Sequence, residues 1–174
     1  MRRGSVAALA LVGAAACVLL TGCTWLDGPL QFSTDGGWIC APTPEYKDVA
    51  FGVNLPDDLT SSITIDSIVL VDAKNAVLGT TSLMLFTPGP GLRLGFDQYP
   101  PTGQFPANWQ KAMPAIGTAT EPGTAYDLVL EVRSDGTNAA RFSGVVMTYT
   151  TAGRQYVAQT HFGLELKKAV SCAG

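Results

Sequence analysis

The sequence predicts an all-β fold, an antiparallel β-sandwich, and three observations support this fold class. Apolar residues recur with a period of two along several segments between residues 47 and 164, the pattern of half-buried strands. Turn-forming residues separate these segments. No segment after residue 22 has the apolar spacing of an amphipathic helix of ordinary length. Roughly six to eight short strands of this kind are typical of a sandwich.

The first half of the domain contains three predicted strands. Residues 49–55 alternate apolar with polar or small side chains, and Pro56 ends this strand. A second strand is expected over residues 63–71, and the continuous apolar run in its second half indicates a more fully buried stretch. Residues 72–75 have turn-forming composition, so residues 76–86 are predicted to return as the third strand.

The C-terminal third shows the clearest alternation. Its predicted strands cover residues 126–132, 142–150 and 156–164. Residues 134–137 and 152–153 supply turns between them, which predicts a three-stranded meander. No proline follows Pro122, so this meander can occupy the interior of a sheet.

Residues 87–122 interrupt the strand pattern. They hold seven of the 11 prolines, so they cannot be regular sheet throughout. A short edge strand over residues 92–96 and a helical turn over residues 107–113, beginning after Pro106, are expected within a long loop.

Four aromatic residues of this Pro/Gly-rich segment form the best candidate binding surface. They are Phe96, Tyr99, Phe105 and Trp109. Aromatic side chains on a loop held by a rigid sandwich can bind a peptide or a glycan. The alternative is that these rings only cover an open edge of the sandwich.

The N-terminus has the features of an export signal. Arg2 and Arg3 precede an apolar stretch over residues 6–20, which is shorter than the about 20 residues that span a bilayer. The stretch leads directly into Leu20-Thr21-Gly22-Cys23. This tetrapeptide resembles the lipobox of bacterial lipoproteins. The resemblance implies cleavage after Gly22 and a diacylglyceryl group on Cys23; the alternative is an ordinary secreted protein in which Cys23 is a free thiol.

Such processing defines the domain organisation and the location. Residues 1–22 would be the signal peptide, 23–37 the lipidated cysteine with a tether, and 38–174 a single β-sandwich domain. Removing 22 of 174 residues, Arg2 and Arg3 among them, leaves 152 residues with nine basic and 14 acidic side chains, a net charge of −5. No basic cluster remains, so a nucleic-acid partner is not expected. We expect the domain to face the extracytoplasmic side of the cell membrane, anchored by its lipid.

The cysteine count then predicts one disulfide. Cys17 leaves with the signal and Cys23 carries the lipid, so Cys40 and Cys172 remain. In an exported protein such a pair favours a bridge. A shared metal site is disfavoured because neither cysteine belongs to a close Cys or His cluster. The bridge would join the segment before the first strand to the end of the domain.

Two further segments resemble a known group of proteins. Residues 68–73 (IVLVDA) and the C-terminal stretch 149–172 are similar to uncharacterised exported lipoproteins of actinobacteria that have an immunoglobulin-like β-sandwich. Roughly six to eight short antiparallel strands, no amphipathic helix of normal length and one end-to-end disulfide also favour an immunoglobulin-like type. The predicted bridge does not have the spacing of the antibody intersheet disulfide, and the resemblance implies no activity.

Catalytic and metal-binding groups are sparse. The one histidine, His161, is expected at the surface or in a structural hydrogen bond, because no Gly-x-Ser-x-Gly motif accompanies it. Met84, Met113 and Met147 are scattered and are interpreted as core residues, which disfavours a copper site. We therefore predict no metal and no cofactor.

Carboxylates offer the remaining route to catalysis. Asp57 and Asp58 follow a proline and are expected to form a turn. Asp66, Glu131 and Glu165 fall within predicted strands and are expected to face solvent. No two of them pair as in a glycosidase, so a carboxylate-based hydrolase is only an alternative to a protein without catalysis.

These observations favour a non-catalytic interaction or ligand-binding module of the cell envelope. Its partner would be an envelope protein, a peptide or a glycan. Two alternatives remain, a structural envelope protein and a small-molecule or metal accessory protein to a transporter.

Overall fold

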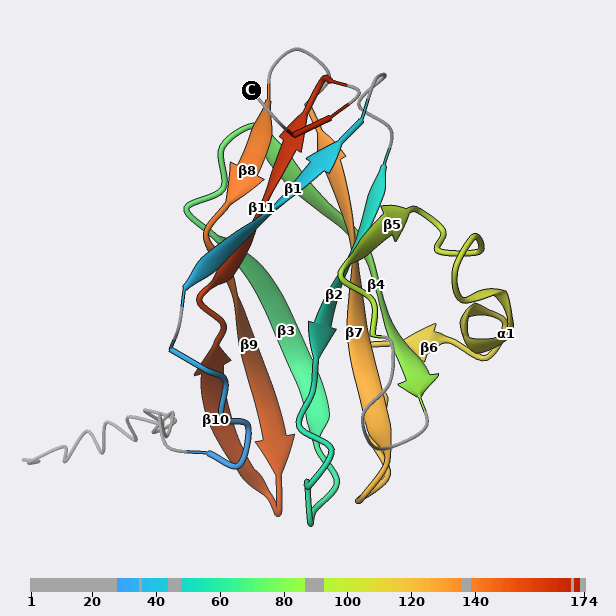
Figure 1. Cartoon of the computed structure of the whole chain (residues 1–174). Coiled ribbons are helices and arrows are strands. Elements are labelled where there is room, and N and C mark those ends of the chain that lie inside the picture. The colour runs from blue at the N-terminus through green and yellow to red at the C-terminus, as the bar shows by residue number, and fades with distance from the viewer. Residues whose placement is uncertain are drawn as a thin grey trace, which may run out of the picture.

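The computed structural model describes residues 28–34, 36–43, 48–86, 93–135, 139–169 and 171–172. Within these ranges the chain is built mainly of β-strands with one short helix, α1 (Pro106–Trp109), so the predicted all-β class is confirmed (Figure 1). The predicted signal peptide and Cys23 lie outside the described residues. In the described part of the chain, no helix is long and apolar enough to cross a membrane.

One open sheet is fully antiparallel and has the order β5-β2-β7-β4-β6. Its strands are β2 (Val49–Asn54), β4 (Ala76–Phe86), β5 (Phe96–Gln98), β6 (Met113–Pro114) and β7 (Ala125–Ser134). The central strand, β7, pairs with all six residues of β2 on one side and with β4 on the other. The edge strands are very short, which limits the exposed backbone.

Two further sheets contain the remaining strands. The first has the order β10-β9-β3 and the second the order β1-β11-β8. The strands are β1 (Gly37–Pro42), β3 (Thr64–Val71), β8 (Ala140–Phe142), β9 (Gly144–Thr151), β10 (Arg154–Gln159) and β11 (Phe162–Lys167). The pair β1 and β11 is parallel, which departs from the purely antiparallel arrangement predicted.

The predicted C-terminal meander is confirmed in its second hairpin, in which β9 pairs with β10, and is wrong in its first. β7 belongs to the sheet with β2 and β4, whereas β9 pairs with β3 and β10. The strands predicted over residues 142–150 and 156–164 are each divided. The first is interrupted at Ser143 and the second at residues 160–161, and at both points the hairpin changes from one sheet to the other. The Thr160 N–H donates to the Val145 oxygen at 2.9 Å, and the Val145 N–H donates to Thr160 Oγ1 at 3.0 Å.

Glycine allows the backbones to approach at this crossing. A Cβ at Gly144 would overlap the carbonyl oxygen of Thr160, and a Cβ at Gly163 would overlap that of Phe142. Only a residue without a side chain fits at either position. The crossing therefore brings Ser143 and His161, the residues between the strands, to the surface beside β1 and β11.

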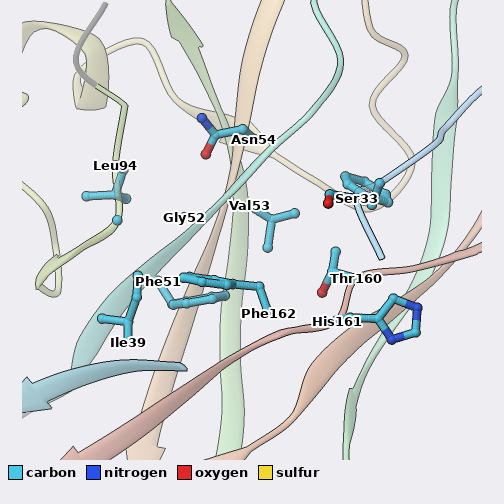
Figure 2. A pocket seen from close by; sticks show the side chains of 12 residues that line it. Ser33, Ile39, Phe51, Gly52, Val53, Asn54, Leu94, Thr160, His161 and Phe162 are labelled. Atoms are coloured by element: carbon cyan, nitrogen blue, oxygen red, sulfur yellow. The ribbon is translucent and has the colours of Figure 1, made fainter. Parts of the chain in front are cut away.

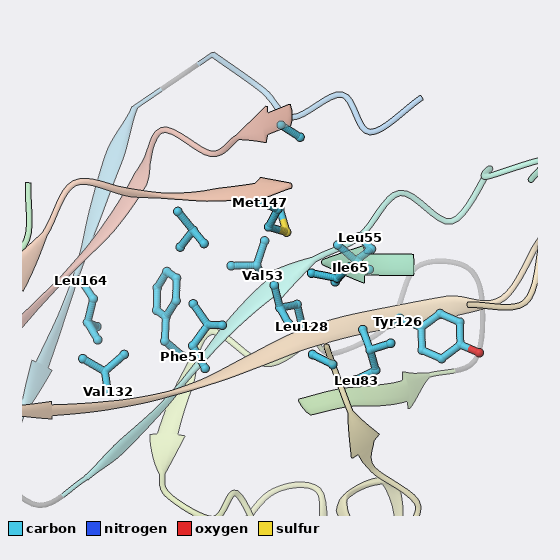
Figure 3. Packing of buried hydrophobic residues seen from close by; sticks show 14 of the residues in the cluster. Phe51, Val53, Leu55, Ile65, Leu83, Tyr126, Leu128, Val132, Met147 and Leu164 are labelled. Carbon is cyan, nitrogen blue, oxygen red and sulfur yellow. The ribbon is translucent and has the colours of Figure 1, made fainter. Parts of the chain in front are cut away.

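Side chains from all three sheets share one hydrophobic core. Figure 3 shows part of it, with contributions from β2, β7 and β9. The rings of Phe51 in β2 and Phe142 in β8 meet edge to face with centroids 5.2 Å apart. The sheets therefore lie as layers over common apolar side chains. The expected burial of residues 68–71 is wrong, because Val69 is 58% exposed.

The segment expected to be a tether is partly packed on the domain. Leu30 is 4% exposed and joins the core, and its N–H donates to the Tyr149 hydroxyl at 3.1 Å. The rings of Tyr149 and Tyr156 stack beside this segment with centroids 5.6 Å apart. The predicted tether boundary at residue 37 is thus too late, since chain packing begins before β1.

Cys40 and Cys172 lie at disulfide distance, with Cα atoms 5.9 Å apart. This geometry agrees with the predicted bridge. Cys40 lies inside β1, however, rather than before the first strand. The link joins this strand to the end of the chain.

Candidate binding surface

The described part of the Pro/Gly-rich segment, from residue 93 onward, packs on the outer face of the sheet that contains β7. Phe105 is 6% exposed and packs in a second hydrophobic cluster with residues of β2, β4 and β7. Its ring meets that of Phe86 at 5.2 Å, and the rings of Tyr99 and Trp109 meet at 5.5 Å. Phe105 therefore lies in a core, and its prediction as a surface residue is wrong.

The other three predicted residues remain at least partly accessible. Phe96 in β5 is 37% exposed, and Tyr99 and Trp109 are half-buried against the second cluster. A binding role for these three stays a prediction. The helical turn expected over residues 107–113 is the shorter α1, Pro106–Trp109, and the edge strand expected over residues 92–96 shares only Phe96 with β5, Phe96–Gln98.

A buried ion pair fastens this segment to β7. Arg93 donates to Asp127 Oδ1 at 3.0 Å and also pairs with Asp57. The Leu94 N–H donates to Asp127 Oδ2 at 3.0 Å. Burial raises the pKa of Asp127, while the Leu94 N–H and the Arg93 guanidinium act in the opposite direction. The arrangement satisfies a carboxylate that has no solvent exposure.

Glu131 is likewise buried, at 3% exposure, which corrects the expectation that it faces solvent. Burial alone would raise its pKa, but hydrogen bonds from the Thr80 N–H and Arg133 outweigh burial and hold the pKa below its ordinary value. The Thr80 nitrogen lies 2.7 Å from Glu131 Oε2, and Arg133 Nη2 lies 2.7 Å from Oε1.

This lowered pKa predicts a loss of stability in acid. A carboxylate whose pKa is lower in the folded than in the unfolded state stabilises the fold above its unfolded pKa, and this contribution is lost as the pH falls through the folded pKa. We expect Glu131→Gln to reduce the dependence of the unfolding free energy on pH below about 4.5, measured by urea denaturation across pH 3–7. An unchanged pH dependence in the variant would contradict this role of Glu131.

An apolar hollow of about 280 Å³ lies between β2 and the β1–β11 pair. Figure 2 shows the rings of Phe51 and Phe162 lying one over the other, with their centroids 6.4 Å apart. Leu94 forms another wall, and His161 stands at the margin. His161 is exposed, as predicted, but it lies between β10 and β11 rather than inside one strand.

A second hollow, of about 510 Å³, is also lined by His161 and is more polar. Its wall includes Trp38 of β1, which is 55% exposed. Asp72, Ser143 and Gln159 also line it. Hence the strand crossing places an exposed indole beside a carboxylate, a hydroxyl, a carboxamide and an imidazole.

The serine, histidine and aspartate of this hollow do not have the order of a catalytic triad. Ser143 Oγ donates to Asp72 Oδ2 at 2.8 Å and lies 3.3 Å from the Val71 oxygen. A serine nucleophile would instead donate to the histidine, which the aspartate would orient. The hydrogen bond instead holds Ser143 and Asp72 in place as polar groups that line the hollow. Among the described residues, no group of three or more His, Cys, Asp or Glu side chains is placed to hold a metal ion.

Trp38, Asp72, Ser143 and Gln159 are not among the site residues that the sequence predicts. Trp38 is the first residue after the expected tether of residues 23–37, and Asp72 is expected in a turn. The turn is present, with φ of 50° at Asp72 and 52° at Asn75. A tryptophan two residues before a bridged cysteine was the available signal, but its neighbours come from distant parts of the chain.

No protein-family model matches the chain, and no curated protein or solved structure is significantly similar to it.

Proposed function

We propose that the chain is an exported, lipid-anchored binding module of the bacterial cell envelope, without catalytic activity. The N-terminal charge, apolar stretch and lipobox support export and attachment through a diacylglyceryl group on Cys23. The acidic mature chain supports attachment by lipid rather than by charge.

We also propose an immunoglobulin-like sandwich as the topology. In that fold one sheet contains strands B, E and D in neighbouring positions, and the facing sheet contains C, F and G. The order β2-β7-β4 and the order β3-β9-β10 follow the same succession along the chain. Sandwiches of this type often present a binding surface on a rigid framework.

The exposed indole of Trp38 is the observation that carries the binding proposal. Tryptophan is among the residues enriched in positions that dominate binding energies, and it is highly buried on average in folded proteins. Trp38 is 55% exposed at the rim of a hollow with fixed polar groups. A rigid aromatic side chain beside a few hydrogen-bonding groups is the usual composition of a ligand site.

Trp38→Ala is expected to remove binding without unfolding the domain, because the side chain is exposed. Full-length protein would be purified with its envelope components from detergent-solubilised membranes, and proteins and glycans that copurify would be quantified. We expect at least one component to fall by about tenfold or more in the variant, as loss of a dominant contact predicts.

Val77→Ala is the matched control, because Val77 in β4 is 51% exposed. This variant should retain the copurifying component. Trp109→Ala tests the aromatic-segment prediction in the same experiment. Equal recovery of every component with Trp38→Ala and the unaltered protein would contradict the proposed site.

A further inference from the structure

The hollow beside Trp38 has a composition that points to one class of ligand. We propose that it binds a neutral carbohydrate, with one sugar ring packed on the indole. This inference rests on the proposed function and names the ligand of the same site. Trp38, Asp72, Gln159 and His161 are the residues that would contact the sugar.

The Trp38 side chain is 55% exposed, and glycines lie before it in β1 and opposite it in β11. Trp38 is in register with Gly163 of β11, so no side chain of β11 stands beside it at that position. Gly36 and Gly37 precede it and also line the hollow. A flat apolar surface of this kind matches the C–H face of a pyranose ring, which packs on aromatic side chains through dispersion and weak C–H contacts.

The close approach of the two backbones at Gly163 also brings the polar side chains of the hollow near the indole of Trp38. A Cβ there would overlap the Phe142 oxygen, so the chain that leads into Ser143 passes directly beside β11. Ser143 Oγ then orients the Asp72 carboxylate through a hydrogen bond of 2.8 Å. A carboxylate held in place in this way can accept a hydrogen bond from a ligand hydroxyl with little loss of side-chain freedom.

The wall supplies both donors and acceptors. The Gln159 carboxamide can do both, and the His161 ring has one donor and one acceptor when neutral. Adjacent hydroxyl groups of a sugar both donate and accept hydrogen bonds, so they need donors and acceptors side by side in the protein. The hollow therefore offers a sugar the indole for packing and, on an adjacent side, polar side chains for hydrogen bonds.

Charge distinguishes a neutral sugar from an anionic one. Among the described residues that line the hollow, Asp72 is acidic and none is Lys or Arg. A phosphate or a uronic acid would therefore meet a carboxylate without a cation to balance it. The volume of about 510 Å³ falls in the ordinary range for small-ligand sites.

Saturation-transfer NMR on the full lipoprotein in nanodiscs tests the inference. The probes are maltotriose, mannotriose, cellotriose and triacetylchitotriose, with trigalacturonate as the anionic comparison. We expect at least one neutral probe to receive saturation, and trigalacturonate to bind at least about tenfold more weakly. Trp38→Ala and Asp72→Ala should each weaken the neutral probe by about tenfold or more, whereas Val77→Ala should leave it unchanged.

Two results would overturn the carbohydrate assignment. One is a lack of saturation transfer to all four neutral probes, and the other is binding that Trp38→Ala does not weaken. If a protein still copurifies in a Trp38-dependent manner, the binding module stands and only its ligand class is wrong. If neither sugar nor envelope component depends on Trp38, both proposals fail.

Discussion

Replacing both Cys40 and Cys172 by alanine is expected to lower the free energy of unfolding by about 2–5 kcal/mol. The two residues are 132 positions apart, so the link would close nearly the whole domain into one loop. A long closed loop restricts the unfolded chain strongly. The loss should be felt most at β1, because within the described residues this strand pairs only with β11.

Urea denaturation of the mature chain, followed by circular dichroism, measures this loss. The unaltered protein under reducing conditions should unfold at nearly the same urea concentration as the double variant, and the reductant should not affect the variant further. Equal unfolding midpoints for oxidised protein and double variant would contradict a stabilising bridge. So would two free thiols in the purified protein.

Asp127→Ala is expected to cost about 3–5 kcal/mol, as the loss of one partner of a buried ion pair does. The substitution leaves the Leu94 N–H without its acceptor and removes one of the two carboxylates paired with Arg93. Asp57 still balances the guanidinium, so we expect the lower part of this range. The second hydrophobic cluster should open as the segment that carries Phe105 detaches.

A double-mutant cycle with Arg93→Ala isolates the pair. The two substitutions together should cost less than the sum of the single ones, because each removes the same interaction. Asp66→Ala is the matched control, since Asp66 is exposed and accepts hydrogen bonds from Thr150 and Gln155 in β9 and β10. It should change stability by less than about 1 kcal/mol. A similarly small effect of Asp127→Ala would show that the segment is not held through β7.

The alternation of apolar and polar residues predicted the strands well, but of the pairings in the C-terminal meander only β9 with β10 is confirmed. Residues 49–54 and 76–86 are strands as expected, because a period of two identifies a strand from local sequence alone. Pairing depends on the route of the chain between sheets. For that reason β7 and β9 were placed in one meander, although the chain crosses to another sheet between them.

Burial of the outer face of β7 was not predictable from that strand. Asp127 and Glu131 alternate with apolar residues, which usually indicates a face in water. The sequence 93–110 covers this face, and its ion pair to Asp127 joins residues more than 30 positions apart. Local sequence patterns in β7 do not show that another segment covers it. The aromatic residues of segment 93–110 indicate only that this segment buries apolar side chains.

The candidate site was missed for a related reason. Trp38 follows two glycines directly after the expected tether of residues 23–37, where the sequence predicts no strand, but it belongs to a strand paired in parallel with β11. Ser143 and His161 reach it only because two strands change sheets at Gly144 and Thr160. A site assembled at a crossing of distant strands leaves little trace in any one segment.

The claim that this domain acts outside the membrane depends on the processing of the chain at Cys23. Mass spectrometry of the N-terminal peptide of the membrane-bound protein tests it directly. We predict a peptide that begins at Cys23 and carries a diacylglyceryl group on its sulfur. A membrane-bound chain that begins at another residue, or that has an unmodified thiol at Cys23, would contradict the account.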